Sequence, residues 1–435
     1  MARAAPGSPP WRSAIGVALA LGLAVSTFSQ KSVAQEITGI DAGIADGTID
    51  IEDERQVEID TSEPPAASGA FGPGIVWSWR GRLNQRFEVD TNRGLRVNSN
   101  GTVYGSRTTV RNTLVARTKR TRLTTSLGVT GIAFAGNEQA EELARIDPRL
   151  VVDLRYDGKR YDIRGRIDGS IDSTSFTQEE ETGNTDDETQ QITVNYDAEI
   201  GFRVDKLNTL VLGVDGRVVD FLESADTLNP NRSIRLTAGS LHALSDVTSL
   251  RFTGAIRYFE ADNNANTRSQ TFSFGSALNH NRTSRHRLAL NAGVTMVRRQ
   301  TDANEETFVG AVGGAGFNYR GNSYNAGLNL LQRVEPTAAG ELQSFTRLVG
   351  SVGFRVAPQQ RLSANLAVSR RARFDDDADA DVARTVVRFG PRYTFNLTPD
   401  TRVNLGYSFR YSTADESAIG HRVFLGISRR LTFSP

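Results

Sequence analysis

The last stretch of the chain, residues 401–435, alternates between polar and apolar residues. From Arg402 to Tyr411 the even positions carry Arg, Asn, Gly, Ser and Arg, and the odd positions carry Val, Leu, Tyr, Phe and Tyr. The alternation resumes at Val423 after a polar loop. Successive side chains of a β-strand point to opposite faces, so each strand has one apolar and one polar face. Paired strands of about ten such residues suit a wall between lipid and a wet interior.

The composition excludes a bundle of membrane helices. Hydrophobic residues are only 38% of the chain, and no apolar run reaches the roughly eighteen residues that a membrane-spanning helix needs. The 51 basic and 50 acidic residues leave a net charge of +1, so the chain has no overall attraction to nucleic acid. Cysteine is absent, which excludes disulfides, thiolate metal sites and a lipoprotein anchor.

The N-terminal segments have the composition of export and linker sequences. Residues 1–34 combine two arginines, an apolar core and small residues at the end, which predicts a secretory signal peptide. An uncleaved membrane anchor is the alternative, but it would need a longer apolar core. Residues 35–76 are rich in Asp and Glu and contain Pro and Gly, which predicts a disordered acidic arm on the periplasmic side. The remaining residues, 77–435, form the predicted barrel.

Hairpin signals recur in this region about every forty residues, a length that fits two membrane strands and one longer loop. Tight turns are predicted at Lys119-Arg120, Asp157-Gly158, Asp205-Lys206, Ser245-Asp246, 281–284, Gly321-Asn322, Pro358-Gln359 and Pro399-Asp400. Longer polar loops are predicted at 92–100, 136–143, 177–188, 223–231, 262–266, 301–305, 335–341, 375–381 and 413–417. Turns and loops alternate strictly, which places both termini on the same side of the membrane.

The predicted fold is therefore all-β: a transmembrane, antiparallel, up-and-down β-barrel of about 18 strands. A count of sixteen stays open, because residues 233–244 and 308–318 sort poorly into two faces. Propeller blades and helical repeats can recur at a similar period. The period-two alternation of the segments argues against both.

Residues 77–435 resemble the β-barrel porins of Gram-negative outer membranes, in particular the group called β-barrel porin 2. The resemblance rests on the hairpin rhythm and on strand composition, such as the run Arg-Leu-Ser-Ala-Asn-Leu-Ala-Val from Arg361. It implies an outer-membrane channel in contact with lipid and lipopolysaccharide, and members of that group often accompany exopolysaccharide genes. Phe433, near the end of the last strand, resembles the terminal aromatic residue that the barrel-insertion machinery recognises.

Assigning the polar face of each strand to the interior gives an arginine-rich lumen. The predicted anion-binding residues are Arg347, Arg355, Arg371, Arg373, Arg388, Arg392, Arg402 and Arg410. Arginine makes bidentate contacts with carboxylate, sulfate and phosphate, and rings of such charges select anions in pores. We predict a channel for anionic solutes, with an acidic exopolysaccharide on its way out as a candidate. The alternative is a closed structural or binding barrel whose lumen is filled by Arg–Asp pairs.

Catalysis, cofactors and metal ions have weaker support in the sequence. The acidic loops 177–188 and 375–381 could hold Ca²⁺ or share divalent ions with lipopolysaccharide phosphates, but neither has EF-hand spacing. No cofactor or metal site is predicted. None of the histidines shows the close pairing with Ser or Asp that hydrolytic barrels need, so the chain is not predicted to be an enzyme. These histidines are His242, His280, His286 and His421.

Overall fold

The structure, a computed structural model, describes residues 74–93, 95, 101–136, 143–174, 190–222, 229–262, 266–283, 285–302, 304–336, 342–373, 384–413 and 417–432. The predicted signal peptide, almost all of the acidic arm, the acidic loops and Phe433 lie outside these ranges. Within them, no helix is long and apolar enough to cross a membrane.

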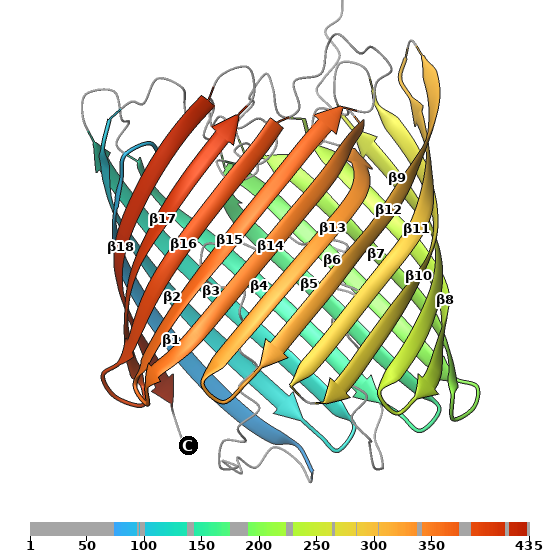
Figure 1. The fold of residues 1–435 in the computed structure, drawn as a ribbon, viewed down its shortest axis with the longest axis horizontal. Helices are drawn as coiled ribbons and strands as arrows, with labels where there is room; N and C mark the ends of the chain where they lie inside the picture. The colour runs from blue at the N-terminus through green and yellow to red at the C-terminus, as the bar shows by residue number, and fades with distance from the viewer. Residues whose placement is uncertain are drawn as a thin grey trace, which may run out of the picture.

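The described ranges form one antiparallel sheet of 18 strands that closes on itself (Figure 1). The strands are β1 Val76–Asp90, β2 Val103–Arg117, β3 Thr121–Gly136, β4 Leu143–Asp157, β5 Tyr161–Ser173, β6 Gln190–Arg203, β7 Asn208–Phe221, β8 Asn231–Ser245, β9 Thr248–Ala261, β10 Arg268–Thr283, β11 His286–Gln300, β12 Glu305–Arg320, β13 Tyr324–Pro336, β14 Leu342–Ala357, β15 Gln360–Arg373, β16 Arg384–Asn396, β17 Thr401–Thr413 and β18 Ser417–Thr432. Each strand pairs with its neighbours in the chain, and β1 pairs with β18 from Arg80↔Thr432 to Asp90↔Arg422. Closure leaves no sheet edge with unpaired backbone groups, as a membrane requires.

The two ends of the barrel differ in their connections. At one end, the turn end, β1 begins, β18 ends and neighbouring strands are joined by short turns; the longer connections lie at the other, the loop end (Figure 1). Each predicted turn and loop overlaps a connection between consecutive strands, although residues 281–283 of the predicted turn 281–284 belong to the end of β10. In outer-membrane barrels the short turns are periplasmic.

The β6–β7 turn shows how local chemistry fixes a tight connection. The carboxylate of Asp205 accepts hydrogen bonds from the backbone N–H groups of Leu207 and Asn208, at 2.7 and 2.8 Å, and from the Asn208 side chain at 2.8 Å. These bonds, the Asn208 side-chain bond first, lower the pKa of Asp205 below its ordinary value. An aspartate that bonds the backbone two or three residues ahead is a common stabiliser of turns.

The two segments whose sequence pattern was ambiguous are both full strands, so the count of sixteen is excluded. In β12 the outward positions between Val309 and Phe317 are Ala311, Gly313 and Ala315, and small residues give little contrast between two faces. The register of β12 is fixed instead by its pairing with β11 along the whole strand. Pairing with the neighbouring strand thus determines which residues of β12 face outward, which its own sequence pattern does not show.

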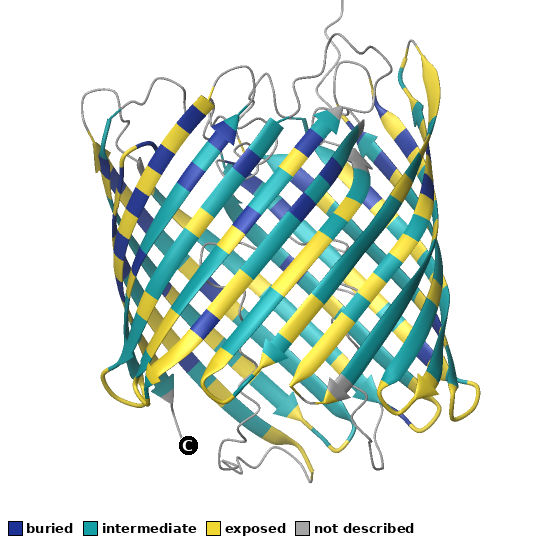
Figure 2. Ribbon diagram, viewed as in Figure 1, coloured by how far each residue is buried: buried dark blue, intermediate teal, exposed yellow. Residues whose placement is uncertain are grey.

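The barrel has an apolar exterior and a polar interior. On β18, Val423, Leu425 and Ile427 are exposed, whereas the alternate residues Arg422 and Phe424 are 4% and 6% exposed. The same alternation runs along the other strands (Figure 2). A closed antiparallel barrel with an apolar outer band is the architecture of bacterial outer-membrane proteins, and this chain is such a protein.

Aromatic residues gather on the outer face at the turn end and form an interfacial girdle. Tyr156 stacks on Tyr161 and Tyr319 on Tyr324, with ring centroids 5.5 and 4.8 Å apart. The exposed members of the girdle are Tyr161, Phe202, Phe317, Tyr324, Phe354 and Tyr393. Aromatic rings with one polar edge prefer the boundary between hydrocarbon and water.

Candidate functional site

The inner wall of the barrel is the surface that a solute would meet, and its charge is unevenly distributed. Strands β14–β18 contain no Asp or Glu. We call the inner face of these five strands the basic wall. Its inward positions carry Arg347, Arg355, Arg361, Arg371, Arg384, Arg388, Arg392, Arg402, Arg410, Arg422 and Arg430.

Seven arginines selected from the sequence occupy inward positions of the basic wall: Arg347, Arg355, Arg371, Arg388, Arg392, Arg402 and Arg410. The register places Arg371 opposite Arg384 and Arg388 opposite Arg410. Cα atoms of directly opposite residues lie about 4.5–5.5 Å apart, so these pairs bring positive charges together from neighbouring strands. Arg373 ends β15, opposite Gln343.

Four members of the wall were not selected from the sequence: Arg361, Arg384, Arg422 and Arg430. Arg361, Arg384 and Arg430 lie at or near a strand end, where strand boundaries are hardest to infer, whereas Arg422 lies further inside β18. The available signal was the alternation itself. Arg384 shares its parity with Arg388 along β16, and Arg361 shares its parity with Arg371 along β15.

Phe345 supports two arginines of the inner wall near the loop end. Its side chain is 1% exposed, and its ring centroid lies 4.7 Å from the guanidinium carbon of Arg371 and 5.0 Å from that of Arg333. Cations are attracted to the face of an aromatic ring. The buried ring therefore restricts where the two guanidinium groups can lie.

Phe424 has the same role nearer the middle of the barrel. Its ring centroid lies 4.0 Å from the guanidinium carbon of Arg86 and 5.4 Å from that of Arg392. The ring lies over Gly406, directly opposite in β17, where an added Cβ would stand 2.2 Å from the ring. Inward phenylalanines opposite glycine were a readable signal that the sequence analysis did not use.

A buried ion cluster joins β1, β17 and β18 near the loop end. Nη2 of Arg410 donates to both carboxylate oxygens of Asp90, at 2.7 and 2.8 Å, and Nε of Arg422 donates to Asp90 at 2.9 Å. The three side chains are 2–4% exposed. Arg410, selected from the sequence as an anion-binding residue, is thus held by a carboxylate of the protein itself.

The cluster also fixes the first residues of the β1–β2 connection, Thr91, Asn92, Arg93 and Leu95, which we call the mouth segment. Arg410 donates to the carbonyl oxygens of Asn92 and Arg93, at 2.7 and 3.3 Å. Leu95 is fully buried, and one of its methyl carbons would lie 3.3 Å from a Cβ added to Gly420 on β18.

At its other side the mouth segment reaches β3. The guanidinium carbon of Arg93 lies 4.0 Å from the ring centroid of Phe134, which packs with Val103 and Ile132 in a buried apolar cluster. Arg410, Gly420 and Phe134 all occupy inward positions. The mouth segment therefore lies along the inner wall from β17 to β3 and narrows the loop end of the lumen.

The wall formed by β3–β9 has a different character, because its arginines face carboxylates. Arg149 donates two hydrogen bonds to Asp168, at 2.6 and 2.9 Å, and Arg166 donates a third at 3.1 Å. Arg235 pairs with Asp215 at 2.7 Å. We call this the mixed wall. It cross-links the strands with little net charge.

The histidines lie on the outer face of the barrel, and each has a polar partner. Their Nδ1 atoms lie within 2.7–3.0 Å of a side-chain oxygen, in the pairs His242–Asn208, His280–Thr248, His286–Thr283 and His421–Tyr407. In the described part of the chain, no group of three or more His, Asp or Glu residues could hold a metal ion.

No family model matches this chain, so the resemblance to the β-barrel porin 2 group stays a prediction. No curated protein matches it either. Among solved structures, OccAB4 of Acinetobacter baumannii is 8% identical, with a TM-score of 0.44 over 82% of this chain and 98% of that one. The Pseudomonas aeruginosa outer membrane protein OpdK is 10% identical, with a TM-score of 0.45 over 82% and 99%. OccK9 (OpdG) of the same species is 11% identical, with a TM-score of 0.46 over 82% and 98%.

Proposed function

We propose that this chain is a passive outer-membrane channel whose basic wall guides anionic solutes, and that an acidic polysaccharide during export is a candidate cargo. The observation that carries the proposal is that the inner face of β14–β18 carries many arginines, whereas these strands contain no Asp or Glu. A wall of one charge sign beside low-dielectric protein and lipid attracts counter-ions into the lumen.

The spacing of the arginines suits a solute with repeated anionic groups. Successive inward residues of a strand are about 6.6 Å apart, so Arg388 and Arg392 stand roughly 13 Å apart along β16. Opposite arginines such as Arg371 and Arg384 are closer. A chain of acidic sugars could then pass its carboxylates from one guanidinium group to the next, each contact being bidentate and transient.

A closed structural barrel is the second candidate, and a specific observation favours it. Arg347 and Arg371 are only 5% and 9% exposed, and the mouth segment narrows the loop end. Neighbouring parts of the protein therefore already cover some of the arginines of the basic wall. A lumen filled in this way would stabilise the barrel without conducting ions.

Planar-bilayer recording separates the two candidates. We expect the purified protein to conduct, and its reversal potential in a potassium chloride gradient to indicate chloride preference. The variant Arg371→Glu/Arg373→Glu/Arg388→Glu/Arg392→Glu should shift the reversal potential towards cation preference. The matched control, Arg235→Gln/Asp215→Asn in the mixed wall, removes one charge of each sign and should leave the preference unchanged.

Absence of ion flux through the intact barrel would favour the closed barrel. An unchanged reversal potential in the fourfold variant would show that these four arginines do not line the conducting path. The export of polysaccharide is tested separately, by comparing the flux of an acidic and a neutral oligosaccharide of equal size through liposomes that contain the protein.

A further inference from the structure

The lipid-facing surface of β1 and β2 carries a patch of polar side chains, Gln85, Ser106, Thr108 and Asn112. Their outward direction follows from parity with Leu83 and Phe87 on β1 and with Tyr104, Val110 and Leu114 on β2, which are all exposed. Each polar residue lies between exposed apolar residues of its own strand. The patch is therefore inside the apolar band and not at its edge.

The patch satisfies only part of its hydrogen-bonding capacity. Nε2 of Gln85 donates to Oγ of Ser106 at 2.9 Å, and the hydroxyl of Thr108 donates to Oε1 of Gln85. This leaves the second N–H of the Gln85 amide, and the structure records no side-chain hydrogen bond for Asn112 within the described residues. Hydrocarbon offers no partner to these amide groups, and leaving them unpaired in lipid is costly.

Small residues lie directly beside the polar ones. The register places Gly131 of β3 opposite Thr108, and Ala133 opposite Ser106. In membranes, contacts between protein segments are enriched in small residues, which let backbones approach, and in hydroxyl and amide side chains, which hydrogen-bond across the contact. The outer face of β1–β3 combines both features.

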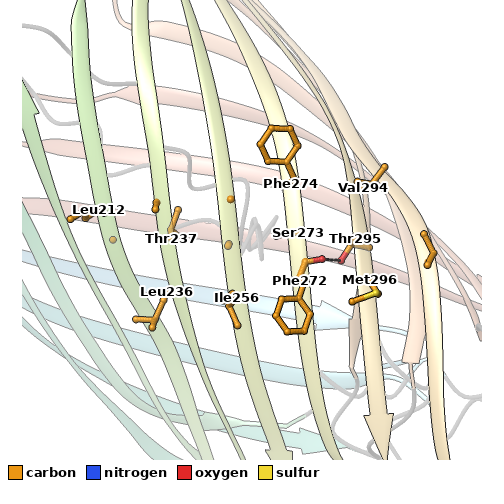
Figure 3. A pocket seen from close by; sticks show the side chains of 15 residues that line it. Leu212, Leu236, Thr237, Ile256, Phe272, Ser273, Phe274, Val294, Thr295 and Met296 are labelled. Atoms are coloured by element: carbon orange, nitrogen blue, oxygen red, sulfur yellow. Dashed lines mark hydrogen bonds between the residues drawn. The ribbon is translucent and has the colours of Figure 1, made fainter. Parts of the chain in front are cut away.

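The opposite side of the barrel has the chemistry expected of a surface that faces lipid. A groove over β7–β12 is lined by exposed Leu212, Leu236, Ile256, Phe272, Phe274 and Met296 (Figure 3). The outward side chains that line this groove are apolar, whereas the patch on β1 and β2 consists of amides and hydroxyls. Lipid tails cover such a groove without loss of hydrogen bonds.

We propose that the patch on β1–β3 is an interface between two copies of this chain in the membrane. A second copy fits because an amide group is its own complement, with one donor side and one acceptor side. A twofold axis along the membrane normal brings the same patch of both copies together, so Gln85 and Asn112 of one copy can pair with the same amides of the other. The proposal does not depend on what passes through the lumen.

The absence of native cysteine allows a direct test in membranes. The variant Asn112→Cys should form disulfide-linked dimers on mild oxidation, because the two patches meet. The control is Val294→Cys, an exposed outward position of β11, which lies on the opposite side of the ring of strands from β2 and should not cross-link. A second variant, Gln85→Leu/Asn112→Leu, should lower the dimer fraction of the otherwise unmodified chain in lipid nanodiscs by about tenfold.

Heat-modifiable migration on gels verifies that each variant still forms the barrel. Equal cross-linking at positions 112 and 294 would overturn the proposal, and so would a cross-link from position 112 only to a different protein. If the leucine variant does not fold, sedimentation of the unmodified chain in nanodiscs decides: a monomer at all concentrations overturns the interface.

Discussion

Arg410 and Asp90 lie 320 residues apart in the sequence and form a doubly hydrogen-bonded ion pair in the structure, at 2.7 and 2.8 Å. The pair joins the first strand to the penultimate one across β18, and it anchors the mouth segment through the Asn92 carbonyl. One carboxylate thus contributes both to closing the barrel and to shaping its loop end.

Asp90→Asn should destabilise the barrel and loosen the mouth segment. The change leaves the guanidinium groups of Arg410 and Arg422 buried without their carboxylate, and breaking a buried pair in this way costs about 3–5 kcal/mol. We expect a lower midpoint in urea unfolding, followed by tryptophan fluorescence in detergent, and larger, noisier single-channel currents. The matched variant Asp168→Asn, in the more exposed mixed wall, should lose less stability and leave the currents steady. Equal effects of both changes would contradict the anchoring role of Asp90.

Gly406→Val should disturb the support of Arg86 and Arg392. An added Cβ would stand 2.2 Å from the Phe424 ring, so the ring must move away from its stacked position. We expect weaker anion preference in the reversal potential, with no change of net charge, and a loss of stability of about 1–3 kcal/mol from overpacking. Gly390→Val, on the inward face of β16, is the comparison variant, because its nearest neighbour is the end of the Asn365 side chain. Unchanged anion preference in Gly406→Val would show that the position of the Phe424 ring does not affect the selectivity of the basic wall.

Labelling in whole cells should show the orientation of the barrel. A cysteine introduced in the β4–β5 turn at Lys159 should be shielded from a membrane-impermeant maleimide, because short turns face the periplasm. A cysteine at Gln178, in the predicted outer loop 177–188, should react. Permeabilised cells provide the control in which both positions react. The reverse pattern in intact cells would invert the orientation.

Deleting residues 36–63 should raise single-channel conductance at low salt and have little effect at high salt. This prediction rests on the sequence alone: a tether of about forty residues reaches roughly 35 Å as a flexible coil, far enough for its carboxylates to meet the basic wall at the lumen mouth. Exposed charge pairs are screened over about 8 Å at physiological ionic strength, so salt should release the arm. Identical currents for both proteins at low salt would reduce the arm to a linker.

The sequence by itself determined the barrel, its hairpin boundaries and the inward parity of the basic wall. Period-two alternation is a local property, because adjacent side chains of any strand point to opposite faces, and turn residues such as Asp205 act within a few positions. Arg371, Arg388 and Arg392 could therefore be assigned to the inner face of their strands from the sequence.

Only the tertiary structure decided which of these charges meet. The Asp90–Arg410–Arg422 cluster depends on the closing of β1 onto β18, and the stacking of Arg86 and Arg392 on Phe424 depends on the registers of four strands. Register between distant segments is set by cross-strand packing and closure of the whole ring. Cross-strand packing and ring closure involve residues far apart in the sequence, so the alternation within one strand cannot predict them.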